Sequence, residues 1–122
     1  MARILIAEDD SSMRHFLAMA LRRAGHHVDV CADGLAALHA LQQDGAAFDL
    51  LLADIVMPGM DGIELSRKAA DAIPGLKVMF ITGFAAVALD KKTDLRPESA
   101  RVLSKPFHLR DLVDQVGQLL AA

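Results

Sequence analysis

The stretch Phe48-Asp49-Leu50-Leu51-Leu52-Ala53-Asp54 is a largely apolar run that ends in a carboxylate, and the turn Met57-Pro58-Gly59-Met60-Asp61-Gly62 follows it closely. A short run of this kind is typical of a strand that is buried on both faces in the middle of a parallel sheet. Ligands of open α/β sheets bind beyond the carboxyl ends of the strands, so Asp54 is a candidate site residue by position. The alternative is that Asp54 only caps the following loop, as aspartate often does in turns.

Three further short apolar segments also end in polar residues, which strengthens the site interpretation. If these segments are strands of one parallel sheet, their carboxyl ends bring acids, a hydroxyl and an ammonium to a single edge. The polar residues are Glu8, Asp9 and Asp10 after residues 3–7, Thr82 and Gly83 after residues 78–81, and Ser104 and Lys105 after residues 102–103.

The segments between these strands show helical spacing of apolar residues. Helices are predicted around residues 13–24, 35–41, 63–72 and 109–120, a short helix starts over 84–89, and residues 27–31 alternate as an edge strand does. Five strands that alternate with five helices predict an α/β fold, a flavodoxin-like doubly wound five-stranded parallel sheet in the order 2-1-3-4-5. In that order the first and third strands are neighbours, so Glu8, Asp9 and Asp54 should meet at the switch point.

Length and composition restrict the class of protein. The 122 residues suit a single domain over 1–122 without a separate output domain. A net charge of −3 without a basic stripe argues against nucleic-acid binding. No apolar stretch approaches the roughly 20 residues that span a membrane, and no signal-peptide pattern is present, so a cytoplasmic protein is expected. The five histidines lack zinc-type spacing.

The predicted acids and cations suit phosphate chemistry. Three carboxylates within a few ångströms cannot all stay ionised cheaply unless a cation neutralises them, and Mg²⁺ prefers such oxygen ligands. With that charge offset, Asp54 can act as a nucleophile on phosphorus, assisted by the ammonium of Lys105. Thr82 can donate its hydroxyl to a phosphoryl oxygen, and Gly83 leaves room for a backbone amide. Pro106 favours a cis Lys105-Pro106 bond more than other residues would.

Five elements in this order resemble the receiver domain of two-component response regulators, over the whole chain: Glu8-Asp9, Asp54, Met57 to Gly62, Thr82-Gly83 and Lys105-Pro106-Phe107. The resemblance implies a phosphoryl group received from a histidine kinase or phosphotransfer protein, and no enzymatic activity beyond self-phosphorylation and dephosphorylation. It also implies the residue roles: Asp54 as phosphoacceptor, Glu8, Asp9, Asp54 and the backbone carbonyl of Val56 as Mg²⁺ ligands, and Thr82, Gly83, Lys105 and Pro106 as phosphate-binding or switch residues.

Two positions depart from the family's pattern. Glu8 stands where the family more often has aspartate, and its extra methylene can alter the metal geometry while keeping the charge. Val102 stands three residues before the lysine, where many members carry Tyr or Phe that moves inward on activation. A switch based on an aromatic ring is therefore not expected.

The apolar run after Thr82 predicts a partner surface formed by Phe84, Val87 and Leu89. The alternative is that this helix is simply buried. Segments near Thr82 and Lys105 resemble a narrower group, stand-alone receivers of alphaproteobacteria that act as adaptors for the ClpXP protease. The end of the chain, Leu120, Ala121 and Ala122, is similar to tails that such unfoldases engage, although a fraying amphipathic helix explains it equally well.

Three other functions remain open at this stage. A receiver-type phosphate relay, or a switch for a different protein target, fits the same residues. An aspartate-nucleophile phosphatase needs a second acid two residues after the nucleophile, where this chain has Val56. A receiver-shaped interaction module that no longer takes phosphate is disfavoured by the intact set of acids, threonine and lysine.

Overall fold

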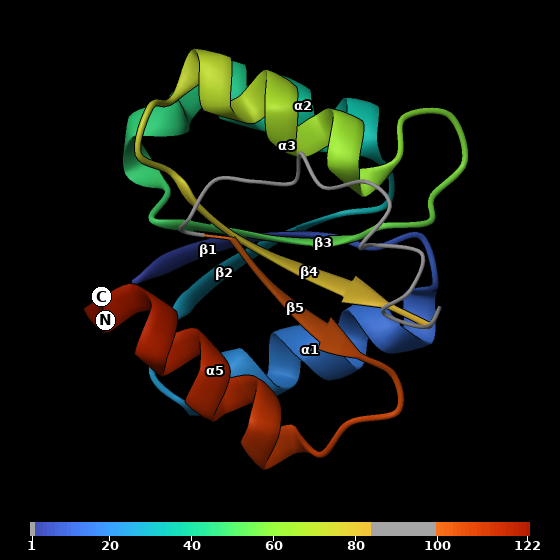
Figure 1. The fold of residues 1–122 in the computed structure, drawn as a ribbon, viewed down its shortest axis with the longest axis vertical. Coiled ribbons are helices and arrows are strands. Elements are labelled where there is room, and N and C mark those ends of the chain that lie inside the picture. Colours follow the sequence, from blue (N-terminus) through green and yellow to red (C-terminus); the bar gives the residue numbers. More distant parts are fainter. Residues whose placement is uncertain (1, 84–99) are drawn as a thin grey trace.

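The computed structural model describes residues 2–83 and 100–122 and contains one parallel sheet in the order β2-β1-β3-β4-β5 (Figure 1). This order and the parallel pairing confirm the predicted doubly wound fold. The strands are β1 (Arg3–Ala7), β2 (His27–Cys31), β3 (Leu50–Asp54), β4 (Lys77–Thr82) and β5 (Ala100–Ser104).

Helices cover both faces of the sheet, with α2 and α3 on one side and α1 and α5 on the other (Figure 1). Their bounds agree with four of the predicted helices. They are α1 (Ser11–Arg23), α2 (Gly34–Asp44), α3 (Gly62–Ala72) and α5 (Leu109–Ala121), with a short 3-10 turn, η1 (Gly45–Ala47), after α2. The predicted helix over 84–89, and with it the predicted partner surface of Phe84, Val87 and Leu89, lies outside the described residues.

Strand β3 separates two layers of core, which explains its continuous apolar sequence. Leu51 and Ala53 pack in the cluster beneath α2 and α3, whereas Leu50 and Leu52 pack in the cluster beneath α1 and α5. Because successive side chains of a strand point to opposite faces, a strand covered on both sides needs apolar residues at every position. Asp54 ends this strand and is itself buried, so its carboxylate is held at the edge of the core.

The helices that follow β1, β2 and β3 each begin at an aspartate. The Asp10 carboxylate accepts hydrogen bonds from the amides of Ser12 (2.9 Å) and Met13 (3.3 Å). Asp33 and Asp61 cap α2 and α3 in the same way. Such caps satisfy amides of the first helical turn that have no partner within the helix. They fix the short loops that carry the site residues.

Gly62 lets the loop between β3 and α3 return against the strand that it leaves. A Cβ atom at this position would lie 2.3 Å from the backbone oxygen of Asp54, and the amide of Gly62 donates to the oxygen of Ile55 at 2.9 Å. Only glycine permits so close an approach of two backbones. Within the described ranges, none of the helices has the length and apolar character required to traverse a bilayer.

Candidate functional site

Three carboxylates converge at the carboxyl edge of the sheet. Glu8, Asp9 and Asp54 each place a carboxylate oxygen within 4.8 Å of the others. The pairing of Ala7 with Ala53 brings the ends of β1 and β3 together, so the loop after β1 faces the last residue of β3. We call these three residues the acid cluster. The structure brings together the acids that the strand order predicted to meet.

The acid cluster is partly sealed from solvent. Glu8 is 1% exposed and Asp54 is 7% exposed, whereas Asp9 is exposed. Burial, followed by the negative charge of Asp54, raises the pKa of Glu8 to about 7, although the amide of Asp10 and the ammonium of Lys105 act in the opposite direction. The cluster therefore favours either a protonated Glu8 or an added cation.

One oxygen of Glu8 lacks a hydrogen-bond partner. The amide of Asp10 donates to Oε2 at 3.1 Å, but Oε1 is the one buried side-chain oxygen or nitrogen without such a partner in residues 2–83 and 100–122. A buried acceptor left unpaired costs free energy, and such exceptions call for a ligand, an ion or water. Three convergent carboxylates, one of them with an oxygen that accepts no hydrogen bond, fit a hard divalent cation such as Mg²⁺.

Lys105 supplies the positive charge of the site. Its Nζ atom lies 3.4 Å from Oδ2 of Asp54 and 3.7 Å from Oε1 of Glu8. The Lys105-Pro106 peptide bond is cis, a state that a proline makes more accessible than other residues do. The amide of Lys105 donates to the oxygen of Thr82 at 2.7 Å, which joins the ends of β5 and β4. The lysine is thus tied by its backbone to one site residue and by its side chain to two others.

The remaining predicted residues surround Asp54. Its Oδ1 atom accepts a hydrogen bond from the amide of Val56 at 3.1 Å, so Asp54 also caps its own loop while its Oδ2 atom faces Lys105. Val56 is 50% exposed. Thr82 is fully buried at the end of β4, one residue beyond the partner of Asp54 in the sheet. Gly83 is exposed, and apart from its chain neighbours no described residue has a heavy atom within 4 Å of the position that a Cβ atom would take there.

One residue at this edge escaped the sequence analysis. Arg14 is half-buried on α1, and its guanidinium donates to the backbone oxygen of Glu8 at 2.8 Å. One feature of the sequence could have pointed to this contact. Arg14 lies one helical turn after the capping Asp10, and a long side chain at that position is directed back toward the start of the helix. Nothing in the sequence pattern indicated that the acceptor would be a carbonyl of the acidic loop.

An apolar hollow of about 540 Å³ adjoins the site and shares Lys105 with it. Its other walls are Met13 and Phe16 on α1, and Gly83, Pro106 and Phe107 on the loops. A protein that reaches Asp54 from this side would meet apolar surface.

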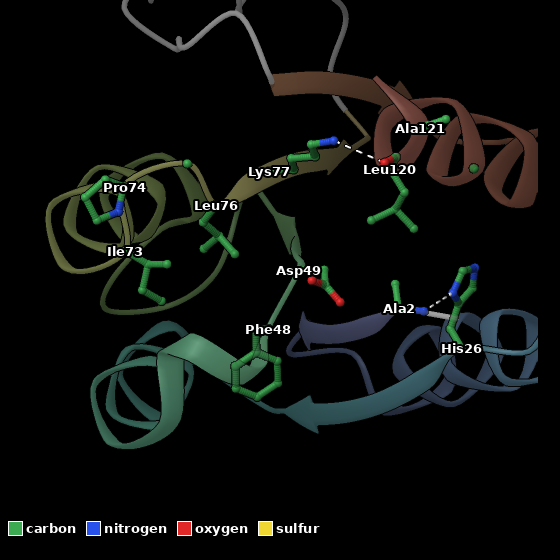
Figure 2. A pocket seen from close by; sticks show the side chains of 12 residues that line it. Ala2, His26, Phe48, Asp49, Ile73, Pro74, Leu76, Lys77, Leu120 and Ala121 are labelled. Carbon is green, nitrogen blue, oxygen red and sulfur yellow. Dashed lines mark hydrogen bonds between the residues drawn. The ribbon is translucent and has the colours of Figure 1, made fainter.

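A larger hollow, of about 660 Å³, lies at the opposite edge of the sheet (Figure 2). Its walls include Ala2, Asp49 and Lys77, which stand at the amino ends of their strands. Figure 2 shows two hydrogen bonds in it: Lys77 Nζ donates to the oxygen of Leu120 at 3.2 Å, and the amide of Ala2 donates to Nδ1 of His26 at 3.2 Å. The acid cluster, with its unpaired oxygen and facing lysine, is the better candidate for chemistry than this more spacious hollow.

Residues 4–117 match the sequence pattern described as the response regulator receiver domain. The chain belongs to this family. Receiver domains bind Mg²⁺ at an acidic pocket, and this chain has an acidic cluster of Glu8, Asp9 and Asp54. The predicted resemblance to response regulators is thereby confirmed.

Three proteins show which members of the receiver family this chain is similar to. The response regulator receiver protein CpdR of Brucella abortus (strain 2308) is 57% identical over 122 residues, which is 100% of this chain and 99% of that protein. A response regulator receiver protein from Sinorhizobium medicae WSM419 has a similar crystal structure, with a TM-score of 0.88 and 31% identity over 99% of this chain and 95% of that one. The receiver domain of the hybrid histidine kinase CckA gives a TM-score of 0.80 and 35% identity over 97% and 98% of the two chains. The chain is therefore a receiver similar to CpdR.

Proposed function

We propose that this protein is a stand-alone two-component response regulator, a single receiver domain over residues 1–122. Asp54 accepts a phosphoryl group from a histidine kinase or a phosphotransfer protein, and the phosphorylated chain changes a surface that binds another protein. The observation that carries the proposal is the position of Asp54, buried beside two further carboxylates and 3.4 Å from Lys105. A nucleophile, an acidic pocket and a cation are the parts that phosphoryl transfer to aspartate needs.

The residues present fit the Mg²⁺ that receivers use. Carboxylate oxygens of Glu8, Asp9 and Asp54 would hold it together with the backbone carbonyl of Val56. The Oε1 atom of Glu8, which accepts no hydrogen bond, and the raised pKa of that residue support a cation here. When bound, the ion offsets the negative charge of the acids and of the incoming phosphoryl oxygens.

Asp54, Lys105, Thr82 and Gly83 carry out the phosphoryl transfer itself. An Asp54 oxygen forms the new bond to phosphorus as the bond from phosphorus to the donor's imidazole nitrogen breaks. Lys105 turns its ammonium from the free carboxylate of Asp54, 3.4 Å away, to an oxygen of the phosphoryl group that Asp54 has accepted. Thr82 donates its hydroxyl to another oxygen, and the open space at Gly83 admits the phosphoryl group to the backbone amide.

The phosphodonor protein reaches Asp54 by docking over the apolar hollow. The hollow includes Lys105, which contacts Asp54 directly, so a partner seated there has its reactive group next to the phosphoacceptor. The walls formed by Met13, Phe16 and Phe107 are partly exposed and apolar, and aromatic residues and methionine are enriched at the cores of protein interfaces.

Phosphorylation shifts the chain between two states by relocating contacts of Lys105 and Thr82. Their backbones are joined by the hydrogen bond of 2.7 Å, so movement at one strand end is transmitted to the other. Val102 is 41% exposed on β5 and has no aromatic ring to swing inward, which leaves the signal to the backbone and the segment after Gly83. The predicted partner surface of Phe84, Val87 and Leu89 follows that glycine in the sequence.

The output that we propose is adaptor control of regulated proteolysis by the ClpXP protease in the cytoplasm. It is supported by the full-length similarity to CpdR, with 57% identity. Residues 120–122 are proposed as a segment that the unfoldase engages. A phosphate relay, or a switch for a different protein target, uses the same site chemistry and differs only in the partner. The phosphatase interpretation has less support, because Val56 occupies the position of the second acid.

The phosphorylation step is tested with acetyl phosphate and Mg²⁺ and intact-mass spectrometry. We expect one base-labile phosphoryl group per chain in the wild type and none in Asp54→Asn. Phosphorylation of Asp54→Asn to the same extent, or sustained turnover of phosphate esters, contradicts the proposal.

The adaptor step is tested by binding of the purified chain to purified ClpX, with and without phosphodonor, for wild type and Asp54→Asn. We expect wild-type binding to change with phosphodonor and variant binding to stay constant. Binding that is absent in every condition contradicts the ClpXP assignment and leaves the phosphorylation test standing.

A further inference from the structure

The loop between β1 and α1, which carries Glu8 and Asp9 of the acid cluster, is held from α1 by one side chain. Arg14 donates from its guanidinium to the backbone oxygen of Glu8 at 2.8 Å. Its own amide donates to the oxygen of Asp10 at 2.8 Å, which is the first hydrogen bond of the helix. Arg14 therefore contacts both ends of the three-residue loop, through its side chain at one end and through its backbone at the other.

Two further hydrogen bonds, both donated by backbone amides of the loop, also fix it. The amide of Glu8 donates to the oxygen of Cys31 at 3.1 Å, and the amide of Asp10 donates to Oε2 of Glu8 at 3.1 Å. Asp9 lies between these two anchored residues, and it is the exposed member of the acid cluster. With no burial to fix it, the direction of Asp9 depends on the orientation of the peptide units on each side of it.

We infer that Arg14 is a positioning residue for the metal site of the proposed function: it fixes the peptide unit between Glu8 and Asp9, and so sets the direction in which Asp9 presents its carboxylate to Mg²⁺. The inference rests on the proposed function, since it assigns a residue to the same site. Arg14 does not itself supply a ligand, because a guanidinium has no acceptor.

Arginine suits this role for a physical reason. Mg²⁺ demands nearly ideal octahedral geometry, so a small rotation of a ligand's backbone lowers affinity more than it would for a larger cation. The guanidinium is planar and offers several donors in a fixed arrangement, so a hydrogen bond to a carbonyl restrains orientation as well as distance. Residues that orient metal ligands typically change affinity by about 10- to 100-fold when they are removed.

The experiment compares Mg²⁺ affinity by isothermal titration calorimetry in wild type, Arg14→Met, Arg14→Lys and Arg23→Met. Arg23 is an exposed arginine in the last turn of α1 and controls for loss of positive charge on the same helix. Urea unfolding in EDTA, measured for each variant, separates loss of metal affinity from loss of folding. If Arg14→Met does not fold in EDTA, Arg14→Gln replaces it.

We expect Arg14→Met to bind Mg²⁺ about tenfold more weakly than wild type with a nearly unchanged urea midpoint, Arg14→Lys to recover part of the affinity, and Arg23→Met to match wild type. Wild-type affinity in Arg14→Met overturns the inference. So does an equal loss in Arg23→Met, because that result indicates a cause other than the lost donor. A lysine variant that recovers nothing supports the inference in its stricter form, in which the planar guanidinium is required.

Asp9→Asn separates this inference from the function on which it rests. If Asp9→Asn loses Mg²⁺ binding while Arg14→Met keeps it, only the positioning role fails. If Asp9→Asn binds Mg²⁺ as the wild type does, the proposed metal site itself is wrong.

Discussion

Lys105 lies between two buried carboxylates, with its Nζ atom 3.4 Å from Oδ2 of Asp54 and 3.7 Å from Oε1 of Glu8. In the absence of metal, this ammonium is the cation that faces both acids within the described residues. Removing one partner of a buried ion pair leaves the remaining charge uncompensated, which costs more than the pair itself contributes. The lysine is therefore expected to support the fold as well as the chemistry.

Lys105→Met should destabilise the metal-free protein by roughly 1–3 kcal/mol at pH 8, a value reduced from that of a fully buried pair because the lysine side chain is 27% exposed. Mg²⁺ should restore more stability to the variant than to wild type. Urea unfolding in EDTA and in Mg²⁺ measures both effects. Lys68→Met is the matched control, since its ion pair with Glu64 is half exposed. Equal stability of Lys105→Met and wild type in EDTA contradicts the interpretation.

The buried Glu8 makes stability depend on pH. Its pKa is raised from 4.5 to about 7, chiefly by burial, so the folded chain binds a proton that the unfolded chain has released between these values. The contribution of Glu8 is complete below pH 4.5 and is lost as pH rises through 7. Metal-free protein should thus lose on the order of 2–3 kcal/mol from this residue between pH 5 and pH 8.

Glu8→Gln removes this titration and keeps the shape of the side chain. Urea unfolding across this pH range in EDTA should show a weaker decline for the variant than for wild type, and Mg²⁺ should counteract the decline in wild type only. If both proteins decline in parallel, the pH dependence has another origin and the raised pKa of Glu8 is not its cause.

The backbone of Gly62 lies close to the backbone of Asp54, and substitution of this glycine tests whether the loop between them holds Asp54 in place. A Cβ atom there would lie 2.3 Å from the backbone oxygen of Asp54, so Gly62→Ala must displace one of the two backbones. We expect a loss of roughly 1–3 kcal/mol in the free energy of unfolding and slower phosphorylation by acetyl phosphate, because the displaced backbone carries the phosphoacceptor.

Gly117→Ala is the control for this substitution. Gly117 lies within α5, and the position that a Cβ atom would take there has no other atom within 4 Å, so alanine should stabilise the helix by about 0.5–1 kcal/mol. Chemical denaturation and phosphorylation rates are measured on both variants. Unfolding curves that coincide for Gly62→Ala and wild type would show that the loop tolerates a methyl group and does not constrain Asp54.

The strands, the helices and their order could be predicted because they follow from the pattern of apolar and polar residues along the sequence. The alternation of five strand segments with five helical segments led to the strand order, and that order placed the acids that follow the first and third strands, Glu8, Asp9 and Asp54, side by side. The spacing of apolar residues in helices and strands, and the polar residues at strand ends, recur along the chain, so a single sequence is enough to recognise them.

Two kinds of contact could not be predicted from the sequence: a hydrogen bond from a single long side chain to a backbone oxygen, and a close approach of two backbones at a glycine. The acceptor of Arg14 is a backbone oxygen, and every residue has such an oxygen, so sequence offers nothing to identify it. Gly62 is simply one of the two glycines in the turn until the return of the loop against Asp54 is known. The same holds for Lys77, whose partners are carbonyls at the far end of the chain.

Lys77 holds the last turn of α5 at the edge of the sheet opposite the acid cluster. Its Nζ atom donates to the backbone oxygen of Leu120 (3.2 Å), one of the last carbonyls of α5, which have no partner within the helix, and to the oxygen of Ala122 (2.8 Å), the residue that follows the helix. Leu120 is also half-buried and packs against the core cluster beneath α1 and α5. In this arrangement the proposed degradation segment, residues 120–122, is docked on the domain and not extended.

Lys77→Met should release this segment. Loss of the two hydrogen bonds is expected to shift the opening equilibrium of the last turn by about 1 kcal/mol, which is about fivefold in population. Hydrogen exchange at the amides of residues 119–122 should accelerate by that factor, and degradation by purified ClpXP should accelerate with it, since an unfoldase engages only the open form. Lys68→Met, an exposed lysine variant on α3, should leave both rates unchanged. If exchange accelerates in Lys77→Met while degradation does not, residues 120–122 are not the segment that the unfoldase grips.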